Sequence, residues 1–367
     1  MINVDNFFKF LKNNKVNFYT GVPDSILKKT KRHFENLNFN NHIPVNNEGS
    51  AVAAAIGYYL TTKKIACVYM QNSGLGNAIN PLISIAHSKV YSIPMMLLIG
   101  WRGSPGIKDE PQHKVKGSIT IRLLKLLNIK YCVLNTEKDL KKLKKLLTMS
   151  KKNNCAVACL VKKETFCSDN FVVRDKIYNK ILREDFIKAL LRNVKNKTKI
   201  VSTTGYASRE LNQVRKKYNF AKGKDFYMVG GMGHSSMVSL VSSLFTKNNV
   251  ICLDGDGSIL MHMGSLASIG TFGRKNIKHI ILNNYGHESV GGQKTFSENI
   301  NFRLVSKGMG YKKYFFLDKN KKMENVIKQF LRSKGPSLLE VIILQKSMKN
   351  LERPKNFYEI KKKFMVS

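Results

Sequence analysis

The sequence predicts an α/β fold made of two doubly wound domains, each with a parallel sheet between layers of helices. Continuous apolar runs alternate with helical patterns through both halves of the chain, and such runs are typical of strands buried on both faces of a parallel sheet. The length of 367 residues allows two well-filled cores, and the 43% hydrophobic content is that of a globular protein. We therefore expect one domain in each half.

The first half, residues 1–165, combines helical and extended patterns. Helical periodicity appears in "VDNFFKFLKNN", "SILKKTKRHF" and the small-residue stretch "GSAVAAAIGYYL". Strands are predicted in "VNFYTG", "KIACVYMQ", "IPMMLLIG" and "CAVACLV". The polar and less regular residues 166–182 are expected to form a linker.

The second half, residues 183–367, repeats this alternation. Strands are predicted in "KIVSTT", "DFYMVGG", "NVICLDGDG", "HIILNN" and "SLLEVII", with helical stretches between them. One of these stretches, "ILMHMGSLASIG", is expected to be a single helix that opens at Ser258.

The chain is strongly basic, with 63 Lys and Arg against 24 Asp and Glu and a formal net charge of +39. Such a charge points to nucleic acid, an anionic surface or acidic small substrates. However, Lys138–Lys152 places leucines at helical spacing with lysines on the outer face, as in a solvated helix. Because no zinc pattern, RNP-like motif or basic tail accompanies the charge, we expect an anionic small-molecule substrate and no nucleic-acid partner.

The six cysteines show no CxxC pair and mostly lie in or beside apolar runs. They are expected to be reduced core residues rather than disulfides or metal ligands. The first residues lack the basic region and cleavage site of a signal peptide, and no apolar run approaches the roughly 18 residues of a membrane span. We therefore expect a cytoplasmic protein with no membrane partner.

Two predicted strands end in polar turns. Asp256 lies between Gly255 and Gly257 after one apolar run, and Asn284 ends "HIILNN". Ligands of open α/β sheets bind at the carboxyl ends of strands, where glycines let a ligand approach the backbone closely. A buried and unpaired Asp is costly, so Asp256 should hold a cation, and carboxylate and amide oxygens suit Mg²⁺. The helix that opens at Ser258 has an N-terminus that favours phosphate.

The pairing of GDG with NN, with residues 258–282 between the two motifs, resembles the signature of thiamine diphosphate (ThDP) enzymes. The resemblance implies that Asp256 and Asn284 bind Mg²⁺ through their side chains and that Gly286 binds it through its carbonyl oxygen. The diphosphate of ThDP would then lie beside the glycines of the GDG turn and Ser258.

Two further motifs fit the same family. "NNEGSAVAAAIGYYL" places Glu48 at the start of a helix in the first half, where the family has a Glu that hydrogen-bonds the aminopyrimidine ring. "VGGMGHSS" supplies Met232 as the apolar wedge that bends the cofactor, and the Gly230 carbonyl as an acceptor for its aminopyrimidine. Each has an ordinary alternative, because a Glu at a helix N-terminus favours the dipole and a methionine fills a core.

Long blocks of the chain are similar to phosphonopyruvate decarboxylases, with sulfopyruvate decarboxylases as close relatives. These blocks are "TGVPDS", "VNNEGSAVAAAIGYYL", "VYMQNSGLGNAINPL", "YSIPMMLLIGWRGSPGIKDEPQH" and "NNYGHESVGGQKT". The resemblance implies a pyrimidine-binding domain in residues 1–165, a diphosphate-binding domain in residues 183–367 and no central domain. It also implies a homodimer or higher homo-oligomer, because the two kinds of domain meet across chains in this family.

The implied activity is the ThDP- and Mg²⁺-dependent decarboxylation of 3-phosphonopyruvate to phosphonoacetaldehyde and CO₂, in phosphonate (2-aminoethylphosphonate) biosynthesis. The alternatives are sulfopyruvate decarboxylase, often built from separate chains, and another 2-keto acid decarboxylase. The fused chain favours the phosphonate enzyme. Outside enzymes, the alternative is a basic binding protein on a ThDP-like fold.

The residues that would face the substrate are less sharply marked. Asp24 in "GVPDS" resembles an active-site Asp that relays a proton to the product, although capping the following helix explains it equally well. A phosphonate requires cationic or donor groups. The candidates are Arg102, Lys108 and His113 in the loop after "MMLLIG", and Lys294 in "GGQKT", although loop cations are usually solvated.

Overall fold

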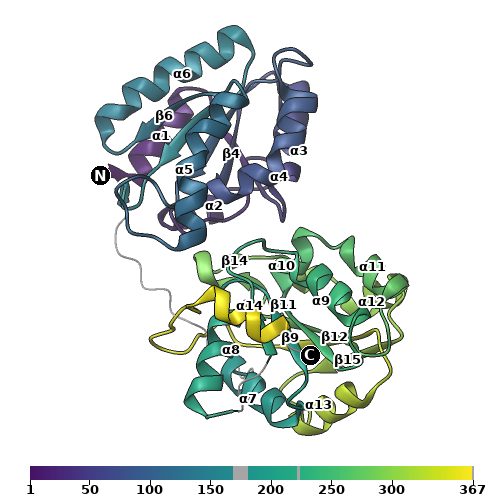
Figure 1. The fold of residues 1–367 in the computed structure, drawn as a ribbon. Coiled ribbons are helices and arrows are strands. Elements are labelled where there is room, and N and C mark those ends of the chain that lie inside the picture. Colours follow the sequence, from purple (N-terminus) through teal and green to yellow (C-terminus); the bar gives the residue numbers. More distant parts are fainter. Residues whose placement is uncertain (168–180, 221–223, 366–367) are drawn as a thin grey trace. The chain divides into compact units, whose positions relative to one another are not determined.

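The computed structural model describes residues 1–167, 181–220 and 224–365, and the chain divides into two compact units, Met1–Val173 and Arg174–Ser367 (Figure 1). Within the described residues, each unit is built around a six-stranded parallel sheet covered by helices. The predicted fold class, two parallel-sheet α/β domains without a central domain, is therefore confirmed.

The predicted linker, residues 166–182, lies mostly outside the described residues. Its first two residues form β8 (Phe166–Cys167), which pairs in parallel with β1 (Ile2–Asn3) in the first unit. At its other end, Ile181 makes a parallel bridge to Ile343 in the second unit. Each end of this segment is thus held by backbone pairing within its own unit.

The main sheet of the first unit has the strand order β3–β2–β4–β5–β7–β6, with all neighbours parallel. Alternate strand residues point to opposite faces, so this sheet needs an apolar layer on both sides. The strands are β2 (Phe18–Gly21), β3 (His42–Pro44), β4 (Ala66–Gln71), β5 (Met95–Gly100), β6 (Lys130–Leu134) and β7 (Val157–Val161).

Helices lie on both faces of this sheet (Figure 1), and two apolar cores fill the space between helices and sheet. Val68 and Leu97 belong to one core, and their strand neighbours Cys67 and Leu98 belong to the other. The first core includes α3 (Glu48–Thr62), α4 (Leu75–Pro81) and α5 (Pro111–Leu126). The second includes α1 (Val4–Asn13), α2 (Lys31–Glu35) and α6 (Leu140–Asn153).

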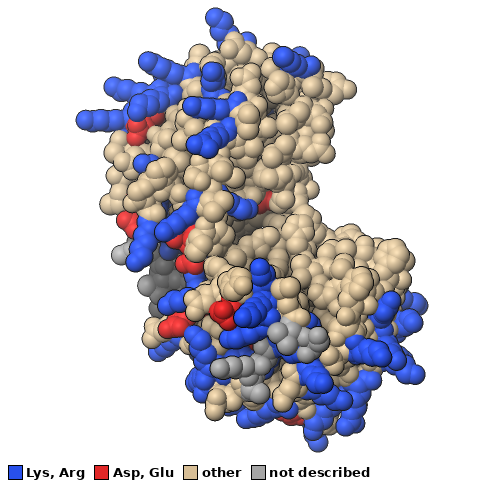
Figure 2. All heavy atoms as spheres, in the orientation of Figure 1, with Lys and Arg blue, Asp and Glu red and all other residues tan. Residues whose placement is uncertain are grey.

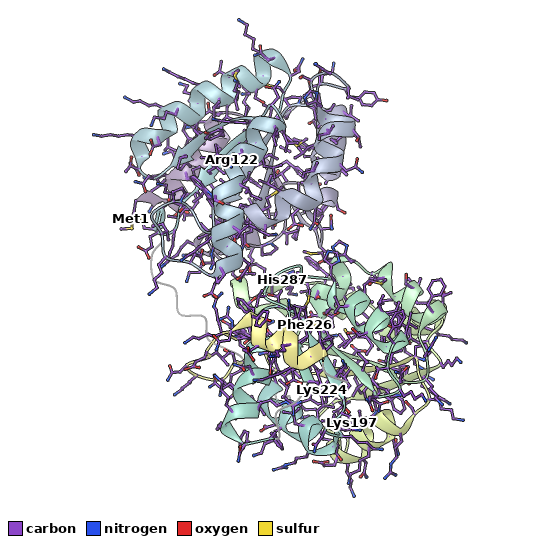
Figure 3. The ribbon with its side chains drawn as sticks, in the orientation of Figure 1. Met1, Arg122, Lys197, Lys224, Phe226 and His287 are labelled. Carbon is purple, nitrogen blue, oxygen red and sulfur yellow. The ribbon has the colours of Figure 1, made fainter. Side chains whose placement is uncertain are left out.

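The second unit has the strand order β10–β9–β11–β12–β16–β15, again with all neighbours parallel. The strands are β9 (Lys199–Ser202), β10 (Lys224–Tyr227), β11 (Val250–Gly255), β12 (Ile277–Asn283), β15 (Lys313–Leu317) and β16 (Ser337–Ile342). The edge strand β10 is covered by α14 (Phe357–Met365), where the rings of Phe226 and Phe364 lie 5.5 Å apart (Figure 3).

Helices again cover both faces of this second sheet. One face packs against α7 (Arg183–Asn193), α8 (Tyr206–Lys217) and α13 (Met323–Arg332). The other packs against α9 (Ser235–Leu244), α10 (Asp256–Met261), α11 (Ser265–Phe272) and α12 (Phe302–Gly308).

The predicted single helix "ILMHMGSLASIG" is wrong, because the segment forms two short helices, α10 and α11. His262 breaks the helix with a non-helical backbone (φ −138°, ψ 51°), and its ring stacks on His234 at 4.5 Å. The predicted helix "SILKKTKRHF" is also shorter than expected, since α2 begins only at Lys31 after a 3₁₀ turn, Lys28–Thr30.

Lysines and arginines are spread over the visible surface of each unit rather than gathered in one stripe (Figure 2). The helix α6 illustrates the pattern that the sequence predicts, since Leu143 and Leu147 are buried while most of its lysines are exposed. Among the described residues, none of the helices combines the length and apolar character needed to cross a membrane.

Candidate active site

The polar residues singled out in the second unit lie together at the carboxyl edge of its sheet. In the parallel pair β11 and β12, Gly255 pairs with Leu282, so the GDG and NN turns leave adjacent strands at the same edge. A short antiparallel pair, β13 (Gly286–His287) with β14 (Gln293–Lys294), follows directly. Ligands of open α/β sheets bind at this edge.

Asp256 is the first residue of α10 and is almost fully buried, with 2% of its surface exposed. Its Oδ2 accepts hydrogen bonds from the hydroxyls of Thr295 and Ser297, the latter at 2.9 Å. Burial raises the pKa of Asp256, and the two hydroxyls offset that effect only in part. A cation beside this carboxylate would lower its pKa again and stabilise the charged form.

The two asparagines after β12 have different surroundings. Asn283 donates from Nδ2 to Glu340 Oε1 at 2.8 Å and is thereby bound to the neighbouring strand β16. Asn284 donates from Nδ2 to Glu288 Oε2 at 3.1 Å, and its Oδ1 accepts from the Gly286 amide at 3.1 Å. Asn283 Oδ1 also accepts from the Tyr285 amide at 3.2 Å and the Ser297 hydroxyl at 2.9 Å, whereas both contacts of the Asn284 side chain are with loop residues.

The hydroxyl of Ser258 connects the GDG turn to the loop that carries Gly230 and Met232. It hydrogen-bonds Thr203 Oγ1 at 2.9 Å, just beyond β9, and it accepts from the Gly233 amide at 3.0 Å. In the described part of the unit, Met232 is half-buried and belongs to neither apolar core. The wedge against a bound cofactor stays a prediction for this residue.

The glycines of these loops differ in the space beside them: Gly233 and Gly257 are crowded, whereas Gly255 faces open space. A Cβ at Gly233 (φ +89°) would lie 2.4 Å from the His262 ring, and one at Gly257 would lie 2.7 Å from the His287 ring. His287 is labelled in Figure 3. A Cβ at Gly255 would meet no atom within 4 Å. Burial lowers the pKa of His287 to about 4, so this neighbour of the turn is neutral near pH 7.

In the first unit, Glu48 is the first residue of α3. The helix begins there because Asn47 caps it, accepting from the Gly49 amide at 2.8 Å. Glu48 is 5% exposed, and its Oε2 accepts from Asn77 Nδ2 at 2.7 Å. Desolvation is the largest influence on its pKa, which is raised. Gly74 makes room for this carboxyl, since a Cβ there would lie 2.3 Å from Oε1.

Asp24 is buried after β2, and its contacts include the turn-capping kind that the sequence offers as one alternative. Its Oδ2 accepts from the amides of Ile26 and Leu27 at 2.9 and 3.3 Å, which fixes the turn before the 3₁₀ segment. Its Oδ1 accepts from Gln71 Nε2 at 2.6 Å, at the end of β4. Burial raises the pKa of Asp24 despite these donors, and its carboxyl packs directly against Gly100.

The cationic candidates differ in their placement. Arg102 is half-buried and paired with Asp109, with Nε 2.7 Å from Oδ2, and its Nη1 donates to Ser25 Oγ at 3.0 Å. Lys108 is exposed in the same loop. His113 was expected in the same loop, but it lies in the first turn of α5, so that placement is wrong.

Lys294 lies in the second unit, on β14. Its side chain is 71% exposed, and its Nζ lies 3.2 Å from Glu298 Oε1. Arg102, by contrast, is fixed close to a buried acidic candidate, because Ser25 follows Asp24 directly and the Arg102 charge acts on the Asp24 pKa.

Sequence reasoning missed the side chains that hold these residues in place. They are Asn77 beside Glu48, Thr295 and Ser297 beside Asp256, Glu288 beside Asn284, and Asp109 beside Arg102. Thr295 and Glu288 lie inside a block that resembles the family, "NNYGHESVGGQKT", so this resemblance could have pointed to them as site residues. Asn77 lies in the first turn of α4 and inside another such block, "VYMQNSGLGNAINPL", but no spacing in the sequence links it to Glu48.

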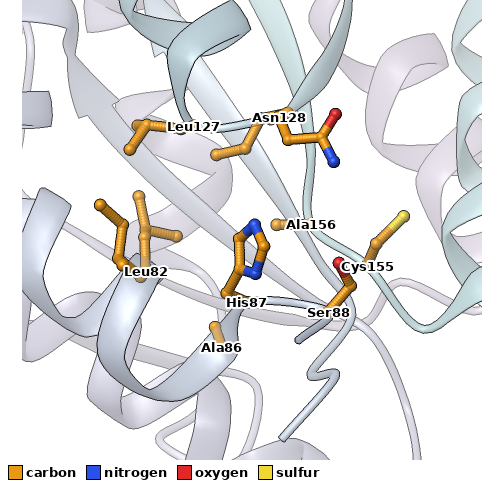
Figure 4. Close-up of a pocket in the computed structure, with 10 residues that line it drawn as sticks. Leu82, Ala86, His87, Ser88, Leu127, Asn128, Cys155 and Ala156 are labelled. Carbon is orange, nitrogen blue, oxygen red and sulfur yellow. The ribbon is translucent and has the colours of Figure 1, made fainter. Parts of the chain in front are cut away.

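A small pocket in the first unit lies away from these residues (Figure 4). It is lined by residues that precede strands, such as Ile129 before β6 and Ala156 before β7, together with His87 and Leu82. The pocket is therefore at the amino edge of the sheet, whereas Asp24 and Gln71 lie at the carboxyl edge. It has no part in the candidate site.

The residues present fit a bound Mg²⁺ and a diphosphate. Asp256 is a buried carboxylate with a raised pKa, Asn284 offers an amide oxygen, and Gly286 follows with a backbone carbonyl. These are hard oxygen ligands of the kind that Mg²⁺ takes. Beside them, the open space at Gly255 gives a ligand access to the turn.

Comparisons with known proteins match both units. Residues 3–122 match the N-terminal TPP binding domain of thiamine pyrophosphate enzymes, and residues 203–341 match their C-terminal TPP binding domain, TPP being ThDP. The phosphonopyruvate decarboxylase of Streptomyces viridochromogenes is 32% identical over 357 residues, covering 91% of this chain and 87% of the relative.

Two further relatives match over most of their length. The phosphonopyruvate decarboxylase of Streptomyces hygroscopicus is 30% identical over 380 residues, covering 97% of this chain and 91% of the relative. The sulfopyruvate decarboxylase of Methanosarcina acetivorans is 24% identical over 324 residues, covering 82% and 81%. The chain therefore belongs to the family of the phosphonopyruvate decarboxylases and is a ThDP-dependent carboxy-lyase.

Proposed function

We propose that this enzyme decarboxylates 3-phosphonopyruvate to phosphonoacetaldehyde and CO₂, with ThDP and Mg²⁺ as cofactors. The observation that carries the proposal is the similarity of 32% and 30% to two phosphonopyruvate decarboxylases over both units. A sulfopyruvate decarboxylase matches over a similar span at 24%, so the fused chain does not itself separate the two substrates. The margin in identity favours the phosphonate.

The cation site of this proposal consists of Asp256, Asn284 and the Gly286 carbonyl. Gly255, Gly257 and Ser258 would hold the diphosphate, while the Gly230 carbonyl and Met232 would fix the bent cofactor. Support comes from their common position at one sheet edge and from the buried, incompletely compensated carboxylate of Asp256. When bound, ThDP supplies the electron sink that stabilises the carbanion left after CO₂ departs.

The two acidic groups of the first unit are suited to proton handling. Glu48 would exchange a proton with the aminopyrimidine ring, and its raised pKa makes the protonated form accessible. Asp24 would deliver the proton that completes the aldehyde. Its buried carboxyl has a raised pKa and is oriented by Gln71, so it is able to hold a proton at a pH where an exposed Asp is ionised.

For the phosphonate group, Arg102 is the strongest of the candidates, with Lys108, His113 and Lys294 behind it. Its guanidinium is fixed by Asp109 and Ser25 close to Asp24, so it presents a charge in a set position. A fixed guanidinium loses little side-chain entropy on binding a dianion. The exposed lysines have no comparable support.

We further propose a homodimer or higher homo-oligomer in the cytoplasm, working in phosphonate biosynthesis. Glu48 and Asp256 belong to different units, and the family builds its site from such units of different chains. Sedimentation at assay concentration tests this. A fully active monomer would refute the oligomer without touching the proposed reaction.

The substrate is tested by letting one preparation decarboxylate 3-phosphonopyruvate, sulfopyruvate and pyruvate, and by comparing kcat/KM. We expect phosphonopyruvate to be preferred, sulfopyruvate to follow, and pyruvate to be rejected at least about 10³-fold, because it leaves the cationic groups unpaired. The Asp256→Ala variant serves as the background control. A preference for sulfopyruvate would identify the second candidate as the substrate.

A non-catalytic binding protein is the remaining alternative, and it makes a different prediction. The purified protein should release ThDP on denaturation, which the thiochrome fluorescence assay measures. If the protein neither contains nor binds ThDP, the enzymatic proposal fails as a whole.

A further inference from the structure

Three side chains form a hydrogen-bonded chain from the first helix of the second unit to the end of β12. Arg183, at the start of α7, donates from Nη2 to Glu288 Oε2. The same Glu288 oxygen accepts from Asn284 Nδ2 at 3.1 Å. Arg183 also donates from Nη1 to Glu210 Oε1 at 3.0 Å. None of Arg183, Glu210 or Glu288 has a role in the proposed reaction.

This chain fixes which way the Asn284 amide faces. Nδ2 points to a carboxylate, which only accepts, and Oδ1 points to the Gly286 amide, which only donates. Turning the amide over would bring two acceptors together at Glu288 and two donors together at Gly286. The carbonyl oxygen, which is the atom a cation needs, is thereby held toward the Gly286 side of the loop.

Glu288 is itself held in one position, because its partner Arg183 is buried and paired. Arg183 is 4% exposed and Glu210 is fully buried, while the Glu288 side chain is 14% exposed. Glu210 is further fixed by the Met348 amide, which donates to its Oε1 at 3.1 Å. Buried charges that are paired and hydrogen-bonded in this way occupy one geometry rather than several.

We propose that Glu288, anchored by Arg183, is a positioning residue that holds the carbonyl oxygen of Asn284 in place for the cation. This rests on the proposed Mg²⁺–ThDP site. Partners of this kind, one step removed from a metal, orient the ligand, and their loss typically weakens metal affinity about 10- to 100-fold. Glu288 would act without touching the cation, ThDP or the substrate.

The test is the affinity for Mn²⁺, used as a paramagnetic probe in place of Mg²⁺, at saturating ThDP, measured by electron paramagnetic resonance on the full-length protein. We expect Glu288→Ala to weaken Mn²⁺ binding at least about 10-fold. Glu288→Gln keeps an acceptor for Asn284 Nδ2 without the charge, so it should remain within about 3-fold of the wild type. Both variants leave Arg183 paired with Glu210, so the fold should survive.

Two controls keep the result clear. Glu184 lies on the same helix as Arg183, and its carboxylate accepts from Lys217 and Tyr218 instead of Asn284. Glu184→Ala should therefore bind Mn²⁺ like the wild type. If Glu288→Ala fails to fold by circular dichroism, Glu288→Met fills the same volume and takes its place.

The inference is overturned if the Mn²⁺ affinity of Glu288→Ala, or of Glu288→Met in its place, is within about 3-fold of the wild-type affinity. It is also overturned if Glu288→Gln is as weak as Glu288→Ala, because the charge and not the orientation would then matter. Failure of the wild type itself to bind Mn²⁺ with ThDP would instead refute the proposed cofactor site, so the two failures are distinguishable.

Discussion

The two units each bury an acidic residue at the start of a helix, but they surround it differently. Glu48 in the first unit is 5% exposed and receives a hydrogen bond from the neutral amide of Asn77. Asp256 in the second unit is 2% exposed and receives two hydroxyl hydrogen bonds on one oxygen. In both, burial raises the pKa.

The difference lies in what would relieve the cost of burial. Around Asp256, the neighbouring groups are oxygen ligands, namely the Asn284 amide oxygen and the Gly286 carbonyl, so a cation relieves it. The Glu48 carboxyl instead accepts from the Asn77 amide nitrogen, which is a donor and not a cation ligand, so a proton relieves the cost of its burial. The comparison teaches that two buried carboxyl groups with the same pKa direction are suited to different tasks, one to a permanent cation and one to a mobile proton.

The largest effect is expected for Asp256→Ala. Removing the charged ligand should weaken Mg²⁺-dependent ThDP binding by several kcal/mol, that is about 100-fold or more, as measured by calorimetry. The fold should persist, because Thr295 and Ser297 still hydrogen-bond each other at 3.0 Å. Asp185→Ala, an exposed residue of the same unit, is the control. Unchanged ThDP affinity in the Asp256 variant would disprove the cation site.

Glu48→Gln should separate binding from chemistry. The amide keeps the size of the side chain, so most ThDP affinity should remain, while kcat falls about 10²- to 10⁴-fold because proton exchange with the aminopyrimidine is lost. Exchange of the thiazolium C2 proton, followed by NMR, measures the step directly. Glu35→Gln, a half-exposed glutamate that pairs with Lys31, is the matched control. Wild-type exchange rates in Glu48→Gln would remove this residue from the mechanism.

The central strands of both sheets were predictable from the sequence, whereas two helices and most of the edge strands were not. Every predicted strand is present, and the strands of the two six-stranded sheets that were not predicted are β3, β6 and β15, each of which lies at an edge of its sheet. The two-residue strands β1, β8, β13 and β14, outside these sheets, were not predicted either. Central strands are buried on both faces and appear as continuous apolar runs. Edge strands such as Lys130–Leu134 and Lys313–Leu317 are partly exposed and begin with Lys, so their apolar signal is weaker.

The candidate site divides in the same way. GDG and NN are local motifs, so the sequence alone brings Asp256 and Asn284 to one edge. The partners that orient them, such as Glu288 and the distant Arg183, depend on tertiary packing that no local spacing encodes. The same holds for Arg102, whose pairing with Asp109 needed the structure.

A third buried carboxyl group, that of Asp24, should make the stability of the folded protein depend on pH. Its folded-state pKa is raised above the ordinary value of 3.8, so between these two values the folded protein binds more protons than the unfolded chain. Its contribution to stability is therefore present at low pH and lost as the pH rises through the raised pKa. Asp24→Asn removes this dependence, so the melting temperature of the variant should rise relative to that of the wild type as the pH increases.

We expect that gain in melting temperature to grow from pH 4 to pH 8, measured by calorimetric scans without cofactor. The exposed Asp5→Asn should show no such trend. A constant difference between Asp24→Asn and the wild type across this range would show that the carboxyl is ionised throughout. Saturating Mg²⁺ and ThDP should leave the Asp24 trend in place, since Asp24 is not a cation ligand.

The smallest effect is expected from Lys294, and it is informative beside Arg102. The Lys294 side chain is 71% exposed, and its pairing with Glu298 is of a surface kind that contributes little. Lys294→Ala should therefore change the KM for phosphonopyruvate less than about 3-fold, whereas Arg102→Ala should raise it more than about 10-fold. Pyruvate carries no phosphonate, so its KM should change little in either variant.

Equal effects on both substrates in Arg102→Ala would mean that this guanidinium supports the Asp24 turn rather than the phosphonate. A large phosphonate-specific effect in Lys294→Ala would instead move substrate recognition to the loop after β14.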